Sequence, residues 1–194
     1  MVLLAGGGFV LAMALAIALV GASANESETG AFDGSTRPAG IPVSDFALRD
    51  EHGKLVRSSA GRGDVTVVTF LYTTCRDTCP IVAQQIAGGL DRLGHDVPVL
   101  AISVDPTNDT PELARRFLRT RQLQNRMHFL LGSRAELEPV WDAYGIQPQG
   151  DGLEHSSYVV LLDRKGRQRI SFPSDRLTPE GLAHDIRELE AEPS

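Results

Sequence analysis

Short apolar runs alternate with longer amphipathic stretches along residues 41–189. Continuous runs rich in β-branched residues predict buried strands, whereas apolar residues spaced by three and four predict helices that cover a sheet. The expected strands are residues 65–72, 97–104, 127–131, 157–162 and 170–172. The expected helices are residues 79–93, 111–122 and 134–144, and a last one that begins at residue 179.

Local signals mark the ends of these elements. Thr110-Pro111 and Thr178-Pro179 each place a capping hydroxyl before a proline at the first helical position. Ser133 and Glu136 form a capping box before the third helix. Residues 46–48 and 55–56, joined by a turn at residues 51–54, predict an N-terminal β-hairpin. The pattern predicts an α/β fold with a central mixed sheet, helices on both faces and a closing hairpin.

The first 24 residues predict export from the cytoplasm. They carry no charged side chain, and residues 9–20 are continuously apolar. Ala22-Ser23-Ala24 fits the cleavage pattern of a signal peptide, but the apolar span also approaches the roughly 20 residues that cross a bilayer. Residues 1–24 are therefore expected to be a signal peptide or an N-terminal membrane anchor, slightly in favour of the anchor. The rest of the chain is expected to be extracytoplasmic, either anchored or secreted after cleavage.

Composition divides the remainder into a linker and one domain. Residues 25–40 are rich in Gly, Ser, Thr, Glu and Pro and show no hydrophobic period, which predicts a flexible linker. Residues 41–194 have the length of a single domain that buries a core without disulfide bonds. The net charge is -6 and the charges are interspersed, which argues against nucleic acid as a partner.

The chain's only cysteines, Cys75 and Cys79, directly follow the first buried strand. On a helix, residues four apart have Cβ atoms about 5–6 Å apart, so the two sulfurs can converge on one soft metal ion. A disulfide between them would need only local rearrangement. The helix N-terminus and the cation of Arg76 are both expected to favour a thiolate. From spacing alone, a metal site and a redox-active pair both stay open.

A buried strand followed by two cysteines at a helix start is a thioredoxin-like arrangement, and three segments resemble the Sco/SenC family of copper proteins. The segments are residues 70–80, residues 103–112 and Glu154-His155-Ser156. The resemblance covers the chain from about residue 41 onward. It implies that Cys75, Cys79 and His155 bind copper. It also implies a metallochaperone that helps to load the binuclear copper centre of cytochrome c oxidase, with the copper-bearing subunit of the oxidase or another copper protein as its partner.

The donor atoms agree with copper. Two thiolates and one imidazole suit Cu(I) and can also hold Cu(II), whereas a structural zinc site usually has four protein ligands. Only the dithiolate is expected to bind the metal, so a disulfide between Cys75 and Cys79 would release it. Residues 105–112 are interpreted first as a strand end, a turn and a capped helix. In a second, functional interpretation, Asp105 at the end of a neighbouring strand lies near the cysteine loop and supports it.

Other functions and other histidines are less favoured. An extracytoplasmic thiol-disulfide oxidoreductase is the main alternative, in which Cys75 and Cys79 would exchange disulfides with target cysteines. Residues 154–157 lack the proline that thioredoxin-like reductases keep before the facing strand, and a thiol peroxidase would need a Pro and a Thr upstream of Cys75. A purely structural disulfide would close a short loop and contribute little to the stability of the folded state.

The remaining histidines, His52, His95, His128 and His184, are expected at the surface or the edge of the core.

Overall fold

The structure, a computed structural model, describes residues 32–147 and 158–193 and has a mixed sheet at its centre. The strands of this sheet are β1 (Ser35–Thr36), β4 (Thr66–Leu71), β5 (Val99–Ser103), β6 (His128–Leu130), β7 (Tyr158–Leu162) and β8 (Gln168–Pro173). They lie in the order β1-β8-β7-β4-β5-β6. β4, β5 and β6 are parallel, while β7 is antiparallel to β4, and β8 is antiparallel to both β7 and β1.

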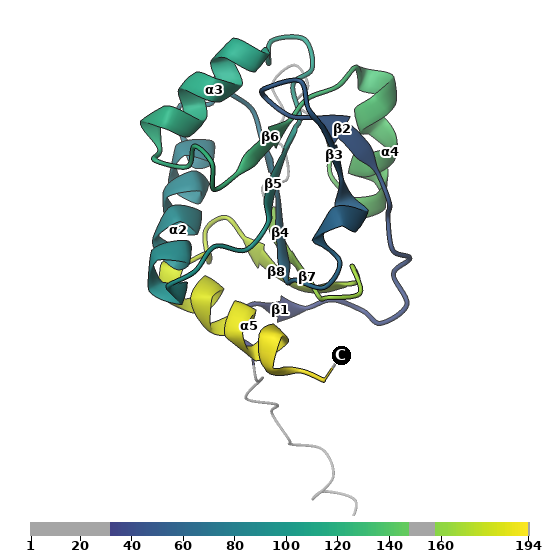
Figure 1. Cartoon of the computed structure of the whole chain (residues 1–194), viewed down its shortest axis with the longest axis vertical. Helices are drawn as coiled ribbons and strands as arrows, with labels where there is room; N and C mark the ends of the chain where they lie inside the picture. Colours follow the sequence, from purple (N-terminus) through teal and green to yellow (C-terminus); the bar gives the residue numbers. More distant parts are fainter. Residues whose placement is uncertain (1–31, 148–157, 194) are drawn as a thin grey trace, which may run out of the picture. The chain divides into compact units, whose positions relative to one another are not determined.

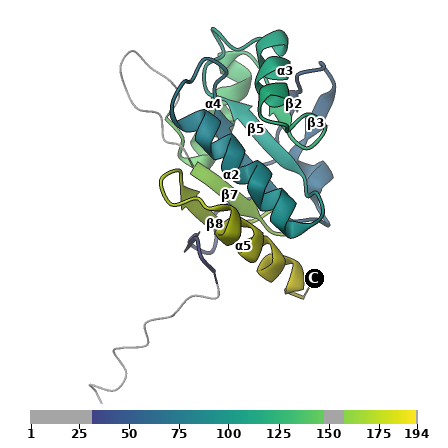
Figure 2. The ribbon, with the colours of Figure 1, turned by 90° about the vertical axis from the view of Figure 1, so that its left-hand side faces the viewer.

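Helices cover both faces of the sheet, as Figure 1 shows. They are α2 (Thr78–Leu93), α3 (Pro111–Thr120), α4 (Arg134–Tyr144) and α5 (Pro179–Ala191). α2, α3 and α5 lie on one face, and α2 and α5 run side by side (Figure 2). The opposite face carries α4 and the hairpin of β2 (Ala47–Arg49) and β3 (Leu55–Arg57), which leads into a short 3-10 helix, η1 (Ser58–Gly61).

Strand β4 shows how one apolar run builds both layers. Successive side chains of a strand point to opposite faces, so a strand between two helical layers is apolar along most of its length. Val67 and Leu71 belong to the core beneath α2 and α5, whereas Val68 and Phe70 belong to the core beneath α4. Every residue of β4 is buried. The predicted buried strand is therefore confirmed.

The predicted hairpin, strands and helices are all present within the described residues, and their ends differ from the predictions by at most two residues. The helix caps are also confirmed. The hydroxyl of Thr110 accepts a hydrogen bond from the backbone N–H of Leu113, and that of Thr178 accepts one from Gly181. The Ser133–Glu136 capping box is complete. Local chemistry thus sets the start of α3, α4 and α5.

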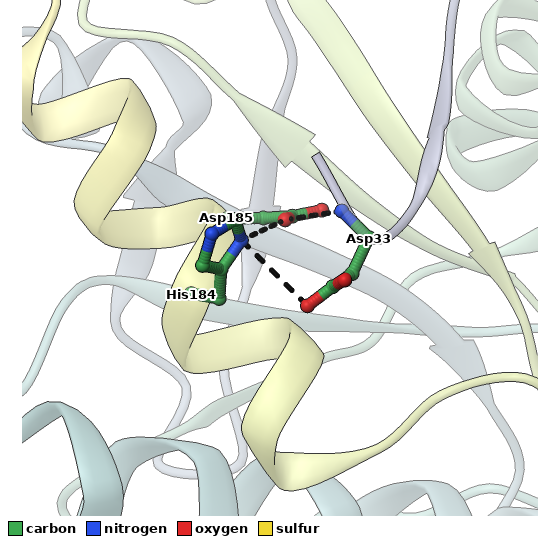
Figure 3. A group of neighbouring side chains, drawn as sticks. All are labelled: Asp33, His184 and Asp185. Carbon is green, nitrogen blue, oxygen red and sulfur yellow. Dashed lines mark hydrogen bonds and ion pairs between the residues drawn. The ribbon is translucent and has the colours of Figure 1, made fainter. Parts of the chain in front are cut away.

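The folded unit begins earlier than the predicted boundary at residue 41. It extends from Phe32. Strand β1 lies in the segment that was predicted to be a linker, and it pairs with β8. The buried carboxylate of Asp185 on α5 accepts hydrogen bonds from the backbone N–H groups of Asp33 and Gly34 at 2.7 and 2.8 Å. Figure 3 shows the hydrogen bond between Asp33 and Asp185 in this clasp. His184 Nδ1 lies 2.9 Å from the same carboxylate. A two-residue strand has no hydrophobic period, so the sequence pattern did not reveal it.

The predicted signal peptide or anchor at residues 1–24 lies outside the described residues. Within residues 32–147 and 158–193, no helix combines the length and the apolar character needed to cross a membrane.

Candidate metal centre

Cys75 and Cys79 lie at the carboxyl end of β4, where the chain turns into α2. Cys75 is in the loop between the two elements, and Cys79 is the second residue of the helix. Neither cysteine is in a disulfide bond, and the two residues are 9% and 0% exposed. The backbone N–H of Cys79 donates a hydrogen bond to Cys75 Sγ at 3.3 Å. The first turn of α2 therefore folds back over the sulfur of Cys75.

The two thiols are electrostatically unequal. A hydrogen bond from the Cys79 side chain is the main reason why the pKa of Cys75 is lowered to about 5, against the opposing effect of burial. Backbone N–H groups of Cys79 and Asp77 also favour the thiolate, as an N-terminal helical turn does. The same sulfur–sulfur hydrogen bond, followed by burial, raises the pKa of Cys79. At neutral pH the pair therefore holds one thiolate and one thiol.

The predicted thiolate is confirmed for Cys75, but its leading causes differ from those expected. The helix N-terminus contributes as expected, whereas Arg76 is exposed and is not among the leading causes. The sequence analysis missed Tyr72, whose hydroxyl donates to the sulfur of Cys75. Burial, followed by this hydrogen bond, raises the pKa of Tyr72 to about 12. Tyr72 therefore stays a donor throughout the physiological pH range.

Asp109 ties the cysteine loop to the neighbouring strand. Its Oδ1 accepts hydrogen bonds from the backbone N–H and the hydroxyl of Thr73, at 2.7 and 2.6 Å. Its Oδ2 accepts one from the hydroxyl of Ser103, the last residue of β5, at 2.6 Å. The carbonyl of Ser103 in turn accepts a hydrogen bond from the indole of Trp141 at 2.9 Å. This network fixes the backbone two residues before Cys75.

Asp105 lies in the turn between β5 and α3, as the favoured interpretation of residues 105–112 predicted. Its carboxylate accepts hydrogen bonds from the backbone and side-chain amides of Asn108. It therefore shapes the turn before α3, while Asp109 holds the loop directly. The signal in the sequence for the contact between Asp109 and the cysteine loop is that Asp109 follows a parallel strand. The ends of neighbouring parallel strands meet at one edge of a sheet.

Comparison with known proteins places the chain in a family. The family model described as SCO1/SenC matches residues 35–191. The chain belongs to the SCO1/SenC family. Protein SenC of Rhodobacter capsulatus is 31% identical over 151 residues, which cover 73% of this chain and 67% of the relative. The resemblance seen in the sequence is therefore confirmed.

Solved SCO1/SenC structures share the fold. Bradyrhizobium japonicum ScoI with copper bound is 33% identical, with a TM-score of 0.65 over 75% of this chain and 98% of that one. BsSco, described with a disulfide switch as a member of the Sco family of cytochrome c oxidase assembly proteins, is 25% identical. Its TM-score is 0.69 over 82% of this chain and 99% of its own. The predicted thioredoxin-like fold is confirmed.

The third ligand predicted for this SCO1/SenC chain, His155, lies outside the described residues. The strand that follows it begins at Tyr158, whose carbonyl accepts a hydrogen bond from the hydroxyl of Thr69 on β4 at 3.3 Å. The four remaining histidines are at the surface or the edge of the core, as expected: His52, His95, His128 and His184.

The unequal thiols predict a distinctive alkylation profile. The reaction of the reduced protein with iodoacetamide is expected to rise with pH around a midpoint near 5, because the Cys75 thiolate is the reactive species. Cys79→Ala is expected to move this midpoint upward, since it removes the main hydrogen bond that lowers the Cys75 pKa. Rates measured by mass spectrometry between pH 4 and 9, a range spanning the usual thiol pKa of about 8.5, test this.

Tyr72→Phe serves as the graded control, because it removes only the weakest of the leading hydrogen bonds to Cys75. It is expected to shift the midpoint less than Cys79→Ala does. A wild-type midpoint near the ordinary thiol value would contradict the assignment of Cys75 as the thiolate.

Proposed function

We propose that this protein is a copper metallochaperone in which Cys75, Cys79 and His155 hold Cu(I) or Cu(II). The observation that carries the proposal is the pair of neighbouring cysteine sulfurs at the start of α2, which are not joined by a disulfide and one of which is favoured as a thiolate. Thiolates are the ligands that Cu(I) prefers, and an added imidazole also accommodates Cu(II). The copper-bound ScoI from B. japonicum, at 33% identity, supports copper as the metal.

The position of His155 in the chain is compatible with this ligand set. Three residue steps separate it from Tyr158, and an extended chain covers at most about 3.6 Å per step, or roughly 11 Å in all. The first residues of β7 pair with β4 close to its carboxyl end, with Val159 opposite Thr69. The cysteine loop leaves that same end of β4. An imidazole within this reach would complete a three-coordinate site.

The proposed task is delivery of copper to another copper protein, with the copper-bearing subunit of cytochrome c oxidase as the partner. The description of BsSco as belonging to a family of oxidase assembly proteins supports this partner. Copper would pass by ligand exchange from Cys75 and Cys79 to the partner's thiolates. Residues 1–24 would export the domain as a signal peptide or a retained anchor, and the residues up to Phe32 would link it to that segment.

Copper titration of a His155 variant tests the ligand set. His155→Ala is expected to retain Cu(I) much better than Cu(II), because two thiolates alone still satisfy Cu(I). Cu(I) affinity is measured by competition with a chromophoric chelator, and Cu(II) by its thiolate charge-transfer band. His95→Ala is the matched control, since His95 lies at the surface with Glu190 as its partner. Equal retention of both oxidation states by His155→Ala would place His155 outside the site.

A thiol-disulfide oxidoreductase is the second candidate, and the unequal thiol pair favours it. The Cys75 thiolate would attack a target disulfide and form a mixed disulfide, releasing one target thiolate. Cys79 would then lose its proton and attack the Cys75 sulfur, which frees the second target thiolate and leaves Cys75 and Cys79 oxidised. The target gains two electrons, so a separate thiol reductant must restore the pair.

Oxidase assembly in cells separates the two functions. If the task is copper delivery, His155→Ala is expected to impair assembly, and added copper is expected to rescue a deletion partly by mass action. If the task is disulfide reduction, His155→Ala is expected to work nearly normally because both thiols remain. A functional His155→Ala strain, together with a deletion that does not respond to copper, would favour the oxidoreductase.

A further inference from the structure

Two adjacent acidic residues, Asp50 and Glu51, are buried in the turn between β2 and β3. They are only 2% and 3% exposed. Burying a carboxylate is costly unless it is paired with a positive charge or coordinates a metal ion. The turn lies against the edge strand β6, because the backbone N–H of Phe129 donates to Glu51 Oε2 at 2.9 Å. The question is what compensates the two buried charges at this sheet edge.

Each carboxylate uses one oxygen for the backbone and turns the other toward an imidazole. Asp50 Oδ1 accepts hydrogen bonds from the backbone N–H groups of His52 and Lys54, both at 2.9 Å. Asp50 Oδ2 lies 3.3 Å from Nδ1 of His128 on β6. Glu51 Oε1 lies 3.4 Å from Nε2 of His52. The carboxylates thus leave one oxygen each beside an aromatic nitrogen that is itself a potential metal ligand.

His128 is the member of this cluster with an unsatisfied atom. Its Nδ1 is buried and has no hydrogen-bond partner among the described residues, although Asp50 Oδ2 is close. The rest of its side chain is partly exposed. A buried ring nitrogen without a hydrogen bond requires an explanation, and a bound ion that accepts its lone pair supplies one.

We propose that Asp50, Glu51 and His128 form a second metal site, separate from the cysteines, for a divalent first-row transition ion such as Zn²⁺. One ligand atom from each of the three residues lies within 4.8 Å of the others. Zinc bonds to nitrogen and oxygen are about 2.0–2.2 Å, so two ligands of one tetrahedral ion lie about 3.3–3.6 Å apart. Side-chain movements of about an ångström would close the site.

The donor types separate this site from the copper centre. One imidazole and two carboxylates, without sulfur, suit Zn²⁺, Co²⁺ or Ni²⁺ and not Cu(I). His52, which is mostly exposed and close to Glu51, is available as a fourth ligand. Arg115 on α3 donates to the carbonyl of Glu51 at 2.6 Å, and its charge opposes a cation. It offsets part of the two negative charges and limits the affinity.

The consequence of an ion here would be structural. Asp50 and Glu51 belong to the turn of the hairpin, whereas His128 is the first residue of β6, so the ion would cross-link two segments far apart in the sequence. In the described sheet β6 is an edge strand of only three residues. A ligand that binds only the folded state stabilises that state in proportion to the logarithm of its concentration.

Zinc titration of the full chain tests the proposal in a background that lacks the cysteines. The Cys75→Ser/Cys79→Ser protein removes thiolate binding, so failure of the copper proposal does not affect the result. We expect one Zn²⁺ per chain by calorimetry and a rise in the melting temperature on adding Zn²⁺ alone. His128→Ala is expected to weaken Zn²⁺ binding at least tenfold, and the Co²⁺ form is expected to lose intensity in its visible absorption.

The matched control is His184→Ala, because His184 belongs to another cluster of a histidine and two carboxylates within the described residues, with Asp33 and Asp185 (Figure 3). It is expected to leave Zn²⁺ binding unchanged. Glu51→Gln is a second test of the site in case His128→Ala does not fold. Its side-chain oxygen still accepts the hydrogen bond from Phe129. Absence of stoichiometric Zn²⁺ binding, binding unaffected by both His128→Ala and Glu51→Gln, or loss of binding with His184→Ala would overturn the proposal.

Discussion

Alanine at either Cys75 or Cys79 is expected to abolish stoichiometric copper binding. One remaining thiolate with one imidazole is a poor site for Cu(I), and the Cu(II) form loses the sulfur that produces its charge-transfer band. The loss is expected to be complete for both variants, since each sulfur is a separate ligand in the proposed site. Titration of the reduced protein with Cu(I) and Cu(II), followed by metal analysis after desalting, measures the effect.

The two variants are expected to differ in the reactivity of the cysteine that remains. Cys75→Ala removes the reactive thiolate, whereas Cys79→Ala removes the hydrogen bond that lowers the Cys75 pKa. Circular dichroism must show that both variants are folded, since Cys79 is fully buried. Retention of one copper per chain by either folded variant would contradict the proposed ligand set, while His95→Ala should bind like the wild type.

Asp109→Ala is expected to lower the free energy of unfolding by about 2–4 kcal/mol, because three donors lose their acceptor. These donors are the backbone N–H and hydroxyl of Thr73 and the hydroxyl of Ser103. The loop that carries Cys75 should loosen at the same time. Urea unfolding measures the stability, and faster alkylation of Cys79 at neutral pH would report the loosening.

Asp109→Asn is the matched control, because its amide oxygen still accepts hydrogen bonds from Thr73. Its loss of stability is expected to be smaller. Burial raises the pKa of Asp109 above its usual value, so the folded state holds the proton more tightly than the unfolded state does. Its contribution to stability is therefore full below the unfolded pKa of about 3.9 and decreases as the pH rises through the folded pKa. This pH dependence should vanish in Asp109→Asn, and its persistence would contradict the assignment.

Local sequence patterns predicted the elements that local chemistry controls. The run around Val67 to Phe70 predicted a strand buried on both faces, since only such a strand has no polar alternation. Thr110 and Thr178 predicted the starts of two helices because a cap depends on residues three positions apart. The cysteine pair was equally visible, because its two members are close in the sequence and follow that strand.

Features that depend on contacts between distant segments were not predictable in the same way. The clasp that holds β1 joins Asp185 to Asp33 across the whole domain, and nothing in the composition near Asp33 indicates it. Asp109 was seen only as part of a turn, although it holds Thr73. The pairing of Asp50 with His128 likewise appears only when the hairpin lies against β6. These contacts follow from the topology of the sheet.

The unequal burial of the two cysteines sets an order of events at the site. Cys79 is completely enclosed, whereas Cys75 keeps a small exposed area. Under the proposed function, an incoming sulfur or metal ion would therefore meet Cys75 first, and Cys79 would bind only after the first bond has formed. Release would follow the reverse order, with Cys75 as the last protein sulfur to dissociate. Exchange would then be sequential, and the copper would leave through a transient intermediate shared with the receiving protein.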